Sequence, residues 1–456
     1  MSDAAALDPP PRSKDWLAEW DPEDEVFWET TGRRIARRTL AITTANLVMA
    51  FVVWFVVSAL ITRMKLVPAF GLTPTKAYWL VAMPGLAGGT LRLVHMFLTP
   101  IIGTRKVVSI STAMLLIPLV GWYFAIQNGD TPYWMFLLLA FLAGLGGGNF
   151  SSFMPSTSLF FPKKQIGTAL ATQAGIGNFG VSLVQFLTPW LIGFGLIGST
   201  QMAKKVSTDA TPTVEWHLQN ALLIWIPIVA VLAIVAWFGL RSVPVRANMR
   251  DQMDIFGERH TYSMTSLYMM TFGLFSGFAT AFPLLIADNF GKAATFGGLP
   301  NPNPHDALKY AFIGPLVGSI MRIVAGPITD RIGGAKVTQV AGVGLVASII
   351  TATFFVQPSS PDEFWPFVLS MVAVFFFTGI GNASTFKQIP GLFDTIKSAG
   401  VIGWTAAIAA YGPFLFGVLI PLMGAVPFYI AVAVFCAFNV GLNWWFFARP
   451  NAPNPC

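Results

Sequence analysis

The sequence predicts an all-α membrane protein in which twelve transmembrane helices form two pseudo-symmetric bundles of six. The first observation is composition: 54% of the 456 residues are hydrophobic and 11% are charged, against about 25% charged residues in soluble domains. The second is that apolar runs of about 20 residues, the length that a helix needs to cross the hydrocarbon, recur along the chain. The third is that motifs of the first half return in the second. Despite a net charge of +7, this composition excludes a cytosolic enzyme and a nucleic-acid-binding protein, because so few polar side chains cannot cover a soluble core.

Each predicted span is an apolar run bounded by polar or basic residues. The spans are expected at 40–61, 75–102, 107–126, 132–160, 166–192, 219–240, 262–287, 306–328, 337–356, 364–389, 398–420 and 426–447. They divide the chain into an N-terminal tail (1–39), an N-terminal bundle (40–240), a linker (241–261), a C-terminal bundle (262–447) and a C-terminal tail (448–456).

The distribution of Lys and Arg predicts that both tails are cytoplasmic. With the N-terminus inside, 18 of the 28 basic residues fall in cytoplasmic segments, which is the excess that such segments carry. The first residues are polar and rich in proline, without the apolar core of a cleavable signal peptide. Asp21–Asp24 has the pattern of a helix start, and the arginines at 33–38 suit a helix end. We therefore expect the N-terminal tail to hold a helix lying on the inner membrane surface.

The two halves of the chain repeat each other. Residues 88–107 align with 318–337 at an offset of 230, which pairs Arg92 with Arg322 and Gly103 with Gly333. A second pair of segments, 147–149 and 380–382, aligns at an offset of 233. Parallel repeats of six helices with a binding site between them are typical of transporters.

Arg92 and Arg322 predict an anion site between the halves. All 21 acidic residues can be placed in tails, loops or span ends, whereas these two arginines lie just past the middle of apolar runs, where a charge costs about 2.5 kcal/mol or more. Because the spans supply no acidic partner, we infer that a small anion neutralises the pair. The planar fork of a guanidinium matches a planar trigonal oxyanion through paired hydrogen bonds. The alternative is that each arginine binds backbone carbonyls or a helix C-terminus.

Two motifs resemble those of a known family. The loop after the eighth span, with Asp330, Arg331, Gly333 and Lys336, looks like the cytoplasmic loop motif of the major facilitator superfamily. Its first-half counterpart has Pro100 where the second half has Asp330. The long segment 143–185 resembles the nitrate signature of NarK-type nitrate/nitrite porters, and 378–393 is a weaker second copy. The resemblance extends from Asp15 to the last helix.

The resemblance implies the major facilitator fold and exchange of nitrate for nitrite by alternating access in a bacterial cytoplasmic membrane, by a protein that we expect to be monomeric and surrounded by lipid. It also implies that Phe150 and Phe272 sandwich the anion and that Tyr268 donates its hydroxyl. Tyr268 lies one turn before Phe272, on the same helix face. Asn178 and Asn149 are candidates to hydrogen-bond the substrate, and the loop motif is implied to act in gating.

Two further side chains have open interpretations. His95, three residues after Arg92, either titrates near neutral pH or is a neutral structural histidine, and the structural reading is favoured. Lys387, in the tenth span, either snorkels to the cytoplasmic boundary or helps to attract the anion. The glycines at 144, 146–148, 175, 177 and 180 let helices approach closely and also expose backbone groups beside a cavity.

The absence of intramembrane carboxylates favours antiport over nitrate/proton symport. Proton coupling normally uses a titratable group in the pathway, and the spans offer His95 alone. A passive anion channel and a membrane nitrate sensor remain as rivals, and the repeat argues against the channel. We expect no enzyme, because no nucleophile, base and oxyanion hole can be assembled from the spans. Neither a cofactor nor a metal is expected, since Cys436 and Cys456 provide no metal-thiolate framework.

Overall fold

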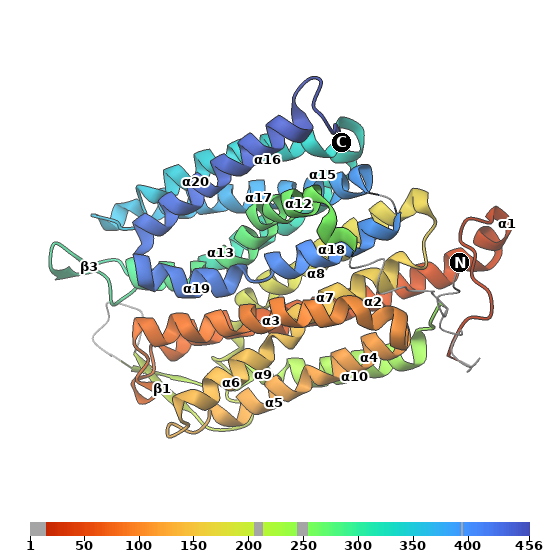
Figure 1. Cartoon of the computed structure of the whole chain (residues 1–456). Helices are drawn as coiled ribbons and strands as arrows, with labels where there is room; N and C mark the ends of the chain where they lie inside the picture. The colour runs from red at the N-terminus through yellow and green to blue at the C-terminus, as the bar shows by residue number, and fades with distance from the viewer. Residues whose placement is uncertain (1–14, 205–212, 244–253, 394) are drawn as a thin grey trace.

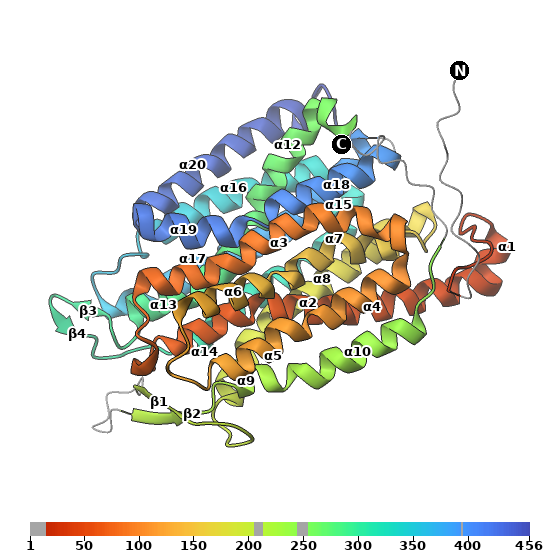
Figure 2. The same cartoon turned by 60° about the horizontal axis from the view of Figure 1, so that its bottom comes forward.

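The computed structural model describes residues 15–204, 213–243, 254–393 and 395–456. Its helices lie alongside one another and group into two halves, one before and one after the segment 240–258 (Figure 1). Helix α1 and Cys456 lie at one end of the molecule, which we call the terminal end. Two short β-hairpins lie at the opposite end, which we call the hairpin end (Figure 2).

The first half contains six helical spans and one hairpin. Its helices are α1 (Glu25–Phe27), a π turn (Trp28–Gly32), α2 (Arg33–Met64), a 3-10 turn (Pro68–Phe70), α3 (Pro74–Ile102), α4 (Thr104–Met114), α5 (Leu116–Ala125), α6 (Tyr133–Ala143), α7 (Leu145–Ser158), α8 (Lys163–Leu191), α9 (Asn220–Leu223) and α10 (Trp225–Gly239). Its strands are β1 (Gln201–Lys204) and β2 (Thr213–Trp216), which pair antiparallel.

The second half repeats the six spans with a smaller hairpin. Its helices are a 3-10 turn (Asp254–Gly257), α12 (Arg259–Tyr268), a π stretch (Met269–Gly273), α13 (Leu274–Phe290), α14 (Leu308–Ala311), α15 (Ile313–Ile332), α16 (Gly334–Thr353), a 3-10 turn (Pro361–Glu363), α17 (Phe364–Leu392), α18 (Thr395–Ala409), α19 (Gly412–Met423), α20 (Ala425–Asn443) and a π turn (Trp444–Ala448). Its strands are β3 (Thr295–Phe296) and β4 (Leu299–Pro300).

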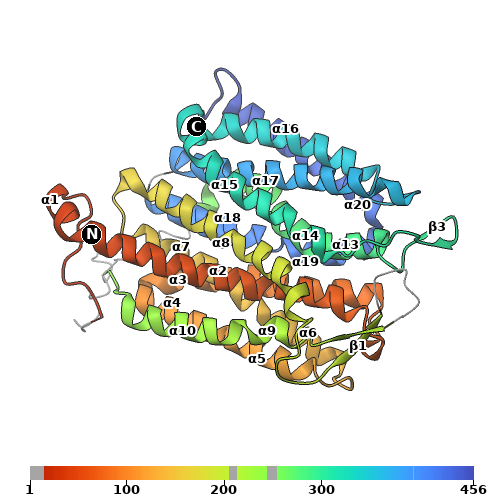
Figure 3. The same ribbon diagram turned by 180° about the vertical axis from the view of Figure 1, so that it is seen from behind.

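The predicted all-α membrane fold is confirmed. Within the described residues, eleven helical runs are long and apolar enough to cross a membrane. Helix α8, 29 residues long, takes the place of the fifth predicted span, and its Gly, Gln, Asn and Ser residues make it more polar than the others. Its polar side chains are tolerated because α8 lies between α2 of its own half and α15 of the other (Figure 3), shielded from lipid along one face.

The first helix is longer than its apolar run. Asp24 caps α1 by accepting hydrogen bonds from the backbone N–H groups of Val26 and Phe27, and the helical run then continues without a break to Met64. The arginines at 33–38 therefore lie in the first turns of α2, and the boundary expected at residue 39 falls inside a continuous helix. A single π turn at Trp28–Gly32 joins the two parts.

The two hairpins were not predicted from the sequence. Each is a short pair of strands in a loop at the hairpin end, too brief to show a two-residue alternation of apolar side chains. The turn of the second hairpin consists of Gly297 and Gly298, both with positive φ, which is the backbone that a tight β-hairpin requires at its two central residues.

The loop motif has the same backbone conformation in both halves. Gly103 ends α3 with φ 81° and Gly333 ends α15 with φ 102°, a region that glycine adopts without strain. The N–H of each glycine donates to the carbonyl of a threonine four residues earlier, Thr99 in the first half and Thr329 in the second. The repeat seen in the sequence is therefore a repeat in structure.

The segment after α20 folds back over the loop motif of the second half. The N–H of Ala335 donates to the backbone oxygen of Cys456 (2.9 Å), and the side chain of Cys456 lies against Gly391. Burial raises the pKa of the Cys456 thiol to about 12. Since the thiolate is the reactive form, the thiol stays protonated and unreactive at every pH well below that value.

We therefore expect slow labelling of Cys456 by maleimide at pH 7 to 8 in the native protein. The measurement uses a Cys436→Ser background, so that one thiol reports, and compares native with detergent-unfolded protein. Labelling of the native thiol should be at least tenfold slower than that of the unfolded one and should accelerate as pH rises. Equal rates in the two states would contradict the packing of this segment.

Candidate functional site

Arg92 lies between the two halves, completely buried on α3. Its Nε donates to the carbonyl of Gly147 on α7 (2.8 Å), and one terminal nitrogen, Nη1, donates to the carbonyl of Ala406 on α18 (2.7 Å). The first bond lies within the N-terminal half and the second joins it to the other half. Its remaining nitrogen, Nη2, is buried and has no hydrogen-bond partner within the described residues.

Arg322 lies opposite, on α15 of the second half, and is 1% exposed. The hydroxyl of Tyr268 lies 3.4 Å from its Nη2, which is the donor of that bond. Its Nη1 is buried without a partner in the described part of the chain. Both guanidinium groups lie over the same ring, that of Phe272, with the central carbon 5.1 Å from the ring centroid for Arg92 and 5.9 Å for Arg322.

The alternative interpretation, in which backbone carbonyls bind the arginines, therefore holds for Arg92 but only in part. Arg92 uses two of its nitrogens on backbone carbonyls, which offsets some of its desolvation. Each arginine nevertheless keeps one buried nitrogen unpaired, and among the described residues no acidic side chain forms an ion pair with either. A buried charged group without a full set of partners is expensive, so the site favours an added anion.

Aromatic rings from both halves surround the arginines. Phe150 of α7 and Phe272 are stacked with ring centroids 6.1 Å apart and planes at 27°. The guanidinium of Arg92 lies 4.6 Å from the centroid of Phe150. Phe272 and Tyr268 are stacked at 5.4 Å with nearly parallel planes, as their spacing of one turn predicts. Phe272 belongs to the π stretch between α12 and α13, a helix irregularity that is frequent at functional sites.

The spacing of Phe150 and Phe272 bears on the predicted sandwich. A flat ion in contact with both rings needs about 7 Å between them, since carbon contacts are about 3.5 Å. The observed 6.1 Å is a distance between the centroids of rings tilted by 27°, and offset rings in direct contact have centroids about 4.5–7 Å apart. Because the gap between the ring planes is no larger than the centroid distance, binding of a flat ion between them requires Phe150 and Phe272, and with them the two halves, to move apart.

The two predicted asparagines have different surroundings. The amide nitrogen of Asn149 lies 3.4 Å from the carbonyl of Ser111 on α4, its acceptor, so Asn149 faces its own bundle. Asn178 on α8 is completely buried, and neither atom of its amide has a partner in the described residues. The amide of Asn178 is therefore free to hydrogen-bond a substrate, whereas the amide nitrogen of Asn149 already has an acceptor.

His95 packs within the first half. Its Nδ1 lies 2.9 Å from the hydroxyl of Ser152 on α7, and the ring is 7% exposed. A buried histidine with a hydroxyl partner fits the structural interpretation better than a role in titration.

Lys387 lies at the terminal end of α17 with about half of its side chain exposed, where it forms an ion pair with Asp330 of the loop motif. Of the two interpretations of Lys387, this exposed position favours snorkelling. Arg331 and Lys336 are also exposed, at the same end. The loop-motif residues thus lie apart from the arginine pair.

The predicted glycines bring helices into contact. Neither Gly146 nor Gly180 leaves room for a Cβ against the backbone of α2, and Gly147 packs against Trp54 of α2 and Gly88 of α3. The carbonyl of Gly147 also binds Arg92, so a glycine that permits close packing also presents backbone to the site.

Sequence reasoning missed two aromatic residues of the site. Phe386 of α17 stacks on Tyr268 with centroids 4.3 Å apart and lies 5.5 Å from the guanidinium carbon of Arg322. The ring centroid of Trp54 on α2 lies 5.2 Å from the guanidinium carbon of Arg92. The indole N–H of Trp54 donates to the carbonyl of Pro84. Phe386 falls inside the second nitrate-type segment, which was the available signal; Trp54 had none among so many apolar residues.

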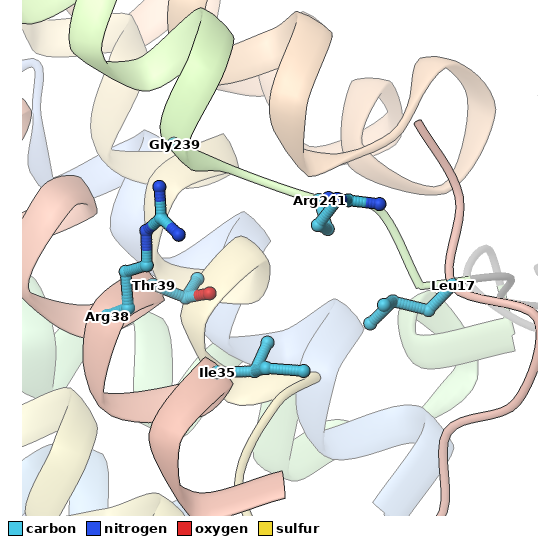
Figure 4. A pocket seen from close by; sticks show the side chains of 6 residues that line it. All are labelled: Leu17, Ile35, Arg38, Thr39, Gly239 and Arg241. Carbon is cyan, nitrogen blue, oxygen red and sulfur yellow. The ribbon is translucent and has the colours of Figure 1, made fainter. Parts of the chain in front are cut away.

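A surface pocket at the terminal end is separate from this site. It lies between the start of α2 and the end of α10, within the first half (Figure 4). Its lining residues are Leu17, Ile35, Arg38, Thr39, Gly239 and Arg241.

Comparisons with known proteins agree with the fold and the motifs. The model of the Major Facilitator Superfamily matches residues 42–291. A probable nitrate/nitrite antiporter, NarK2, of Thermus thermophilus is 54% identical over 448 residues, covering 97% of this chain and 98% of the relative. The nitrate/nitrite transporter NarU of Escherichia coli is 32% identical, with the same coverage. A nitrite extrusion protein of Bacillus subtilis is 28% identical over 82% of this chain and 84% of its own. The chain therefore belongs to the Major Facilitator Superfamily and, within it, to the NarK-type nitrate/nitrite porters.

Proposed function

We propose that this chain exchanges nitrate for nitrite across a bacterial cytoplasmic membrane, with the anion bound between Arg92 and Arg322. The supporting observation is the unmet hydrogen bonding of the pair. Two buried guanidinium groups, one from each half, lie against one phenylalanine ring, and each has one nitrogen without a partner in the described residues. A planar oxyanion supplies both the negative charge and the acceptors that these nitrogens lack.

The aromatic rings would select for a flat ion. Phe150 and Phe272 would cover its two faces, and Tyr268, already within hydrogen-bond distance of Arg322, would add its hydroxyl at the edge. Asn178, with its free amide, is the stronger of the two asparagine candidates. A tetrahedral oxyanion has no flat face to place against the two rings, so phosphate and sulfate are expected to be poor substrates.

Two electrostatic costs favour exchange over uniport: moving the anion against the membrane potential and bringing the two arginines together in an empty site. Import of one monoanion against an inside-negative potential costs about 2.3 kcal/mol per 100 mV, and exchange for a second monoanion cancels that cost. An empty site leaves two like charges facing each other in a medium of low dielectric constant, which opposes closure of the halves. A bound anion removes this repulsion, so that movement between the two access states occurs with the site loaded.

Contacts at the hairpin end would form one gate of this cycle. Arg63 of α2 lies 2.8 Å from a carboxylate oxygen of Asp306 in the other half, and Lys65 forms an ion pair with Asp288. Arg63 is almost fully buried and also lies over the ring of Trp216. These pairs join the halves at the hairpin end, which the distribution of basic residues assigns to the outside of the membrane. The loop motif at Asp330–Lys336 would then act on the cytoplasmic side, with both tails.

Counterflow in proteoliposomes tests exchange against its alternatives. Isotopic nitrate uptake is expected to require nitrite or nitrate inside and to be insensitive to an imposed proton gradient at clamped potential. Uptake into empty vesicles driven by an inward proton gradient would instead identify a symporter, and conductance without counterflow a channel. Binding of nitrate without any flux would identify a sensor. Each of these three results contradicts the proposal.

A further inference from the structure

Asn382 on α17 is a buried amide that the site described above does not use. It is 0% exposed, and neither its amide nitrogen nor its amide oxygen has a hydrogen-bond partner within the described residues. An unsatisfied buried amide is costly, and such groups in native proteins require an explanation. In the sequence repeat, Asn382 aligns with Asn149, whose amide instead binds a backbone carbonyl of its own bundle.

The neighbours of Asn382 along α17 show which way its face is turned. Gly379, one turn before it, packs directly on the backbone of Gly318 on α15. Phe386, one turn after it, lies against Arg322 and Tyr268. Residues at i, i+3 and i+7 lie on one face of a helix, so Asn382 shares the face that carries these contacts. The opposite face binds α16, where Ser384 and Gln388 both hydrogen-bond to Thr338.

The level of Asn382 in the bundle matches that of Arg322. Helices α15 and α17 both run from the hairpin end to the terminal end, and Gly318 touches Gly379. From that contact, Arg322 lies about 6 Å along α15, whereas Asn382 and Phe386 lie about 4.5 and 10.5 Å along α17, at 1.5 Å per residue. The amide is therefore turned toward the arginine from the neighbouring helix.

We propose that Asn382 is a further substrate-binding residue, whose amide N–H donates to an oxygen of the planar anion held by Arg322. This inference rests on the proposed function of the arginine pair and adds a neutral donor on a third helix of the second half. A neutral donor strengthens binding of an oxyanion without adding a third positive charge, and it helps to fix the rotation of the ion about its axis.

The test uses Asn382→Asp, which keeps the size of the side chain and adds a negative charge. Beside Arg322, which has no acidic partner among the described residues, the carboxylate would take the place of the anion. The variant is therefore expected to fold with a melting temperature, in nitrate-free buffer, equal to or above that of the parent protein. Nitrate should then no longer raise the melting temperature, and nitrate exchange should fall at least 100-fold. Asn382→Ala should raise the KM for nitrate about tenfold with a smaller effect on maximal rate.

The matched control is Asn439→Asp on α20, also fully buried, with its amide nitrogen bound to the carbonyl of Phe435 within its own helix. None of the described contacts joins it to Arg92 or Arg322, so the added charge should lower the melting temperature and leave the nitrate response of the folded fraction intact. Loss of folding in Asn382→Asp, a fall in melting temperature like that of the control, or retained exchange would each overturn the assignment of Asn382. Absence of a nitrate response in the parent protein would instead refute the proposed function.

Discussion

Replacing Arg92 or Arg322 by lysine is expected to abolish nitrate exchange while leaving a folded protein. Lysine keeps the charge but presents a single point donor in place of a planar fork. Hydrogen bonds to charged groups contribute about 1.5–3 kcal/mol each, so losing one such bond to the anion reduces binding about 10- to 150-fold. Arg92→Lys should be the more severe change, because Arg92 also donates to Ala406 across the interface between the halves.

The measurement is the initial rate of isotopic nitrate uptake into nitrite-loaded proteoliposomes, with size-exclusion profile and melting temperature as evidence of folding. Arg33→Lys is the matched control, since Arg33 is exposed and pairs with Glu29 one turn away on the same helical run. Its transport should equal that of the parent protein. Parent-like uptake by Arg92→Lys or Arg322→Lys would remove that arginine from the site.

Neutralising Asp306 is expected to open the hairpin end. The change Asp306→Asn would leave Arg63 buried without its ionic partner, and breaking one side of a partly buried pair costs about 1–3 kcal/mol after allowance for the exposure of Asp306. That cost applies in the state in which the halves meet at the hairpin end. It therefore shifts the balance between the two access states about 5- to 150-fold toward the state open there, and exchange slows because both states must be visited in each cycle.

Spin labels at Lys76 and Ala293 report this opening, because they lie at the hairpin end in the first and second halves respectively. The distance distribution of Asp306→Asn is expected to move to longer values, and less so with nitrate bound. Glu29→Gln makes the same change of charge in a pair within one helix and should leave the distribution unaltered. An unchanged distribution in Asp306→Asn would show that the ion pair does not hold the halves together.

The spans and the arginine pair could be predicted from the sequence because lipid acts on each segment by itself. A helix in hydrocarbon must be apolar over about 20 residues, so composition along the chain marks it without reference to other helices. Arg92 and Arg322 stand out for the same reason: a charge inside an apolar run is costly wherever the run is placed. The fifth span was predicted in the same way, although α8 is more polar than the other spans and is tolerated through its contacts with α2 and α15.

The contacts of individual side chains could not be predicted from the composition of single segments. Lys387 lies in an apolar run yet is exposed and paired with Asp330, because the run ends at the terminal end of the bundle. Phe386 joins the site while many other phenylalanines pack against lipid or core. Nothing in the local sequence separates these cases, because the deciding contacts come from other helices.

The fold class, the repeat and the two buried charges for which we propose an anion could all be inferred from the sequence, since each follows from the chemistry of one segment in contact with lipid. Tertiary structure alone decided what those charges meet. The carbonyl of Ala406 that binds Arg92, the ring of Phe272 that lies under both arginines, and the partner of Arg63 at the hairpin end all come from the second half of the chain. Such contacts depend on how two bundles pack, and packing is a property of surfaces brought together by folding.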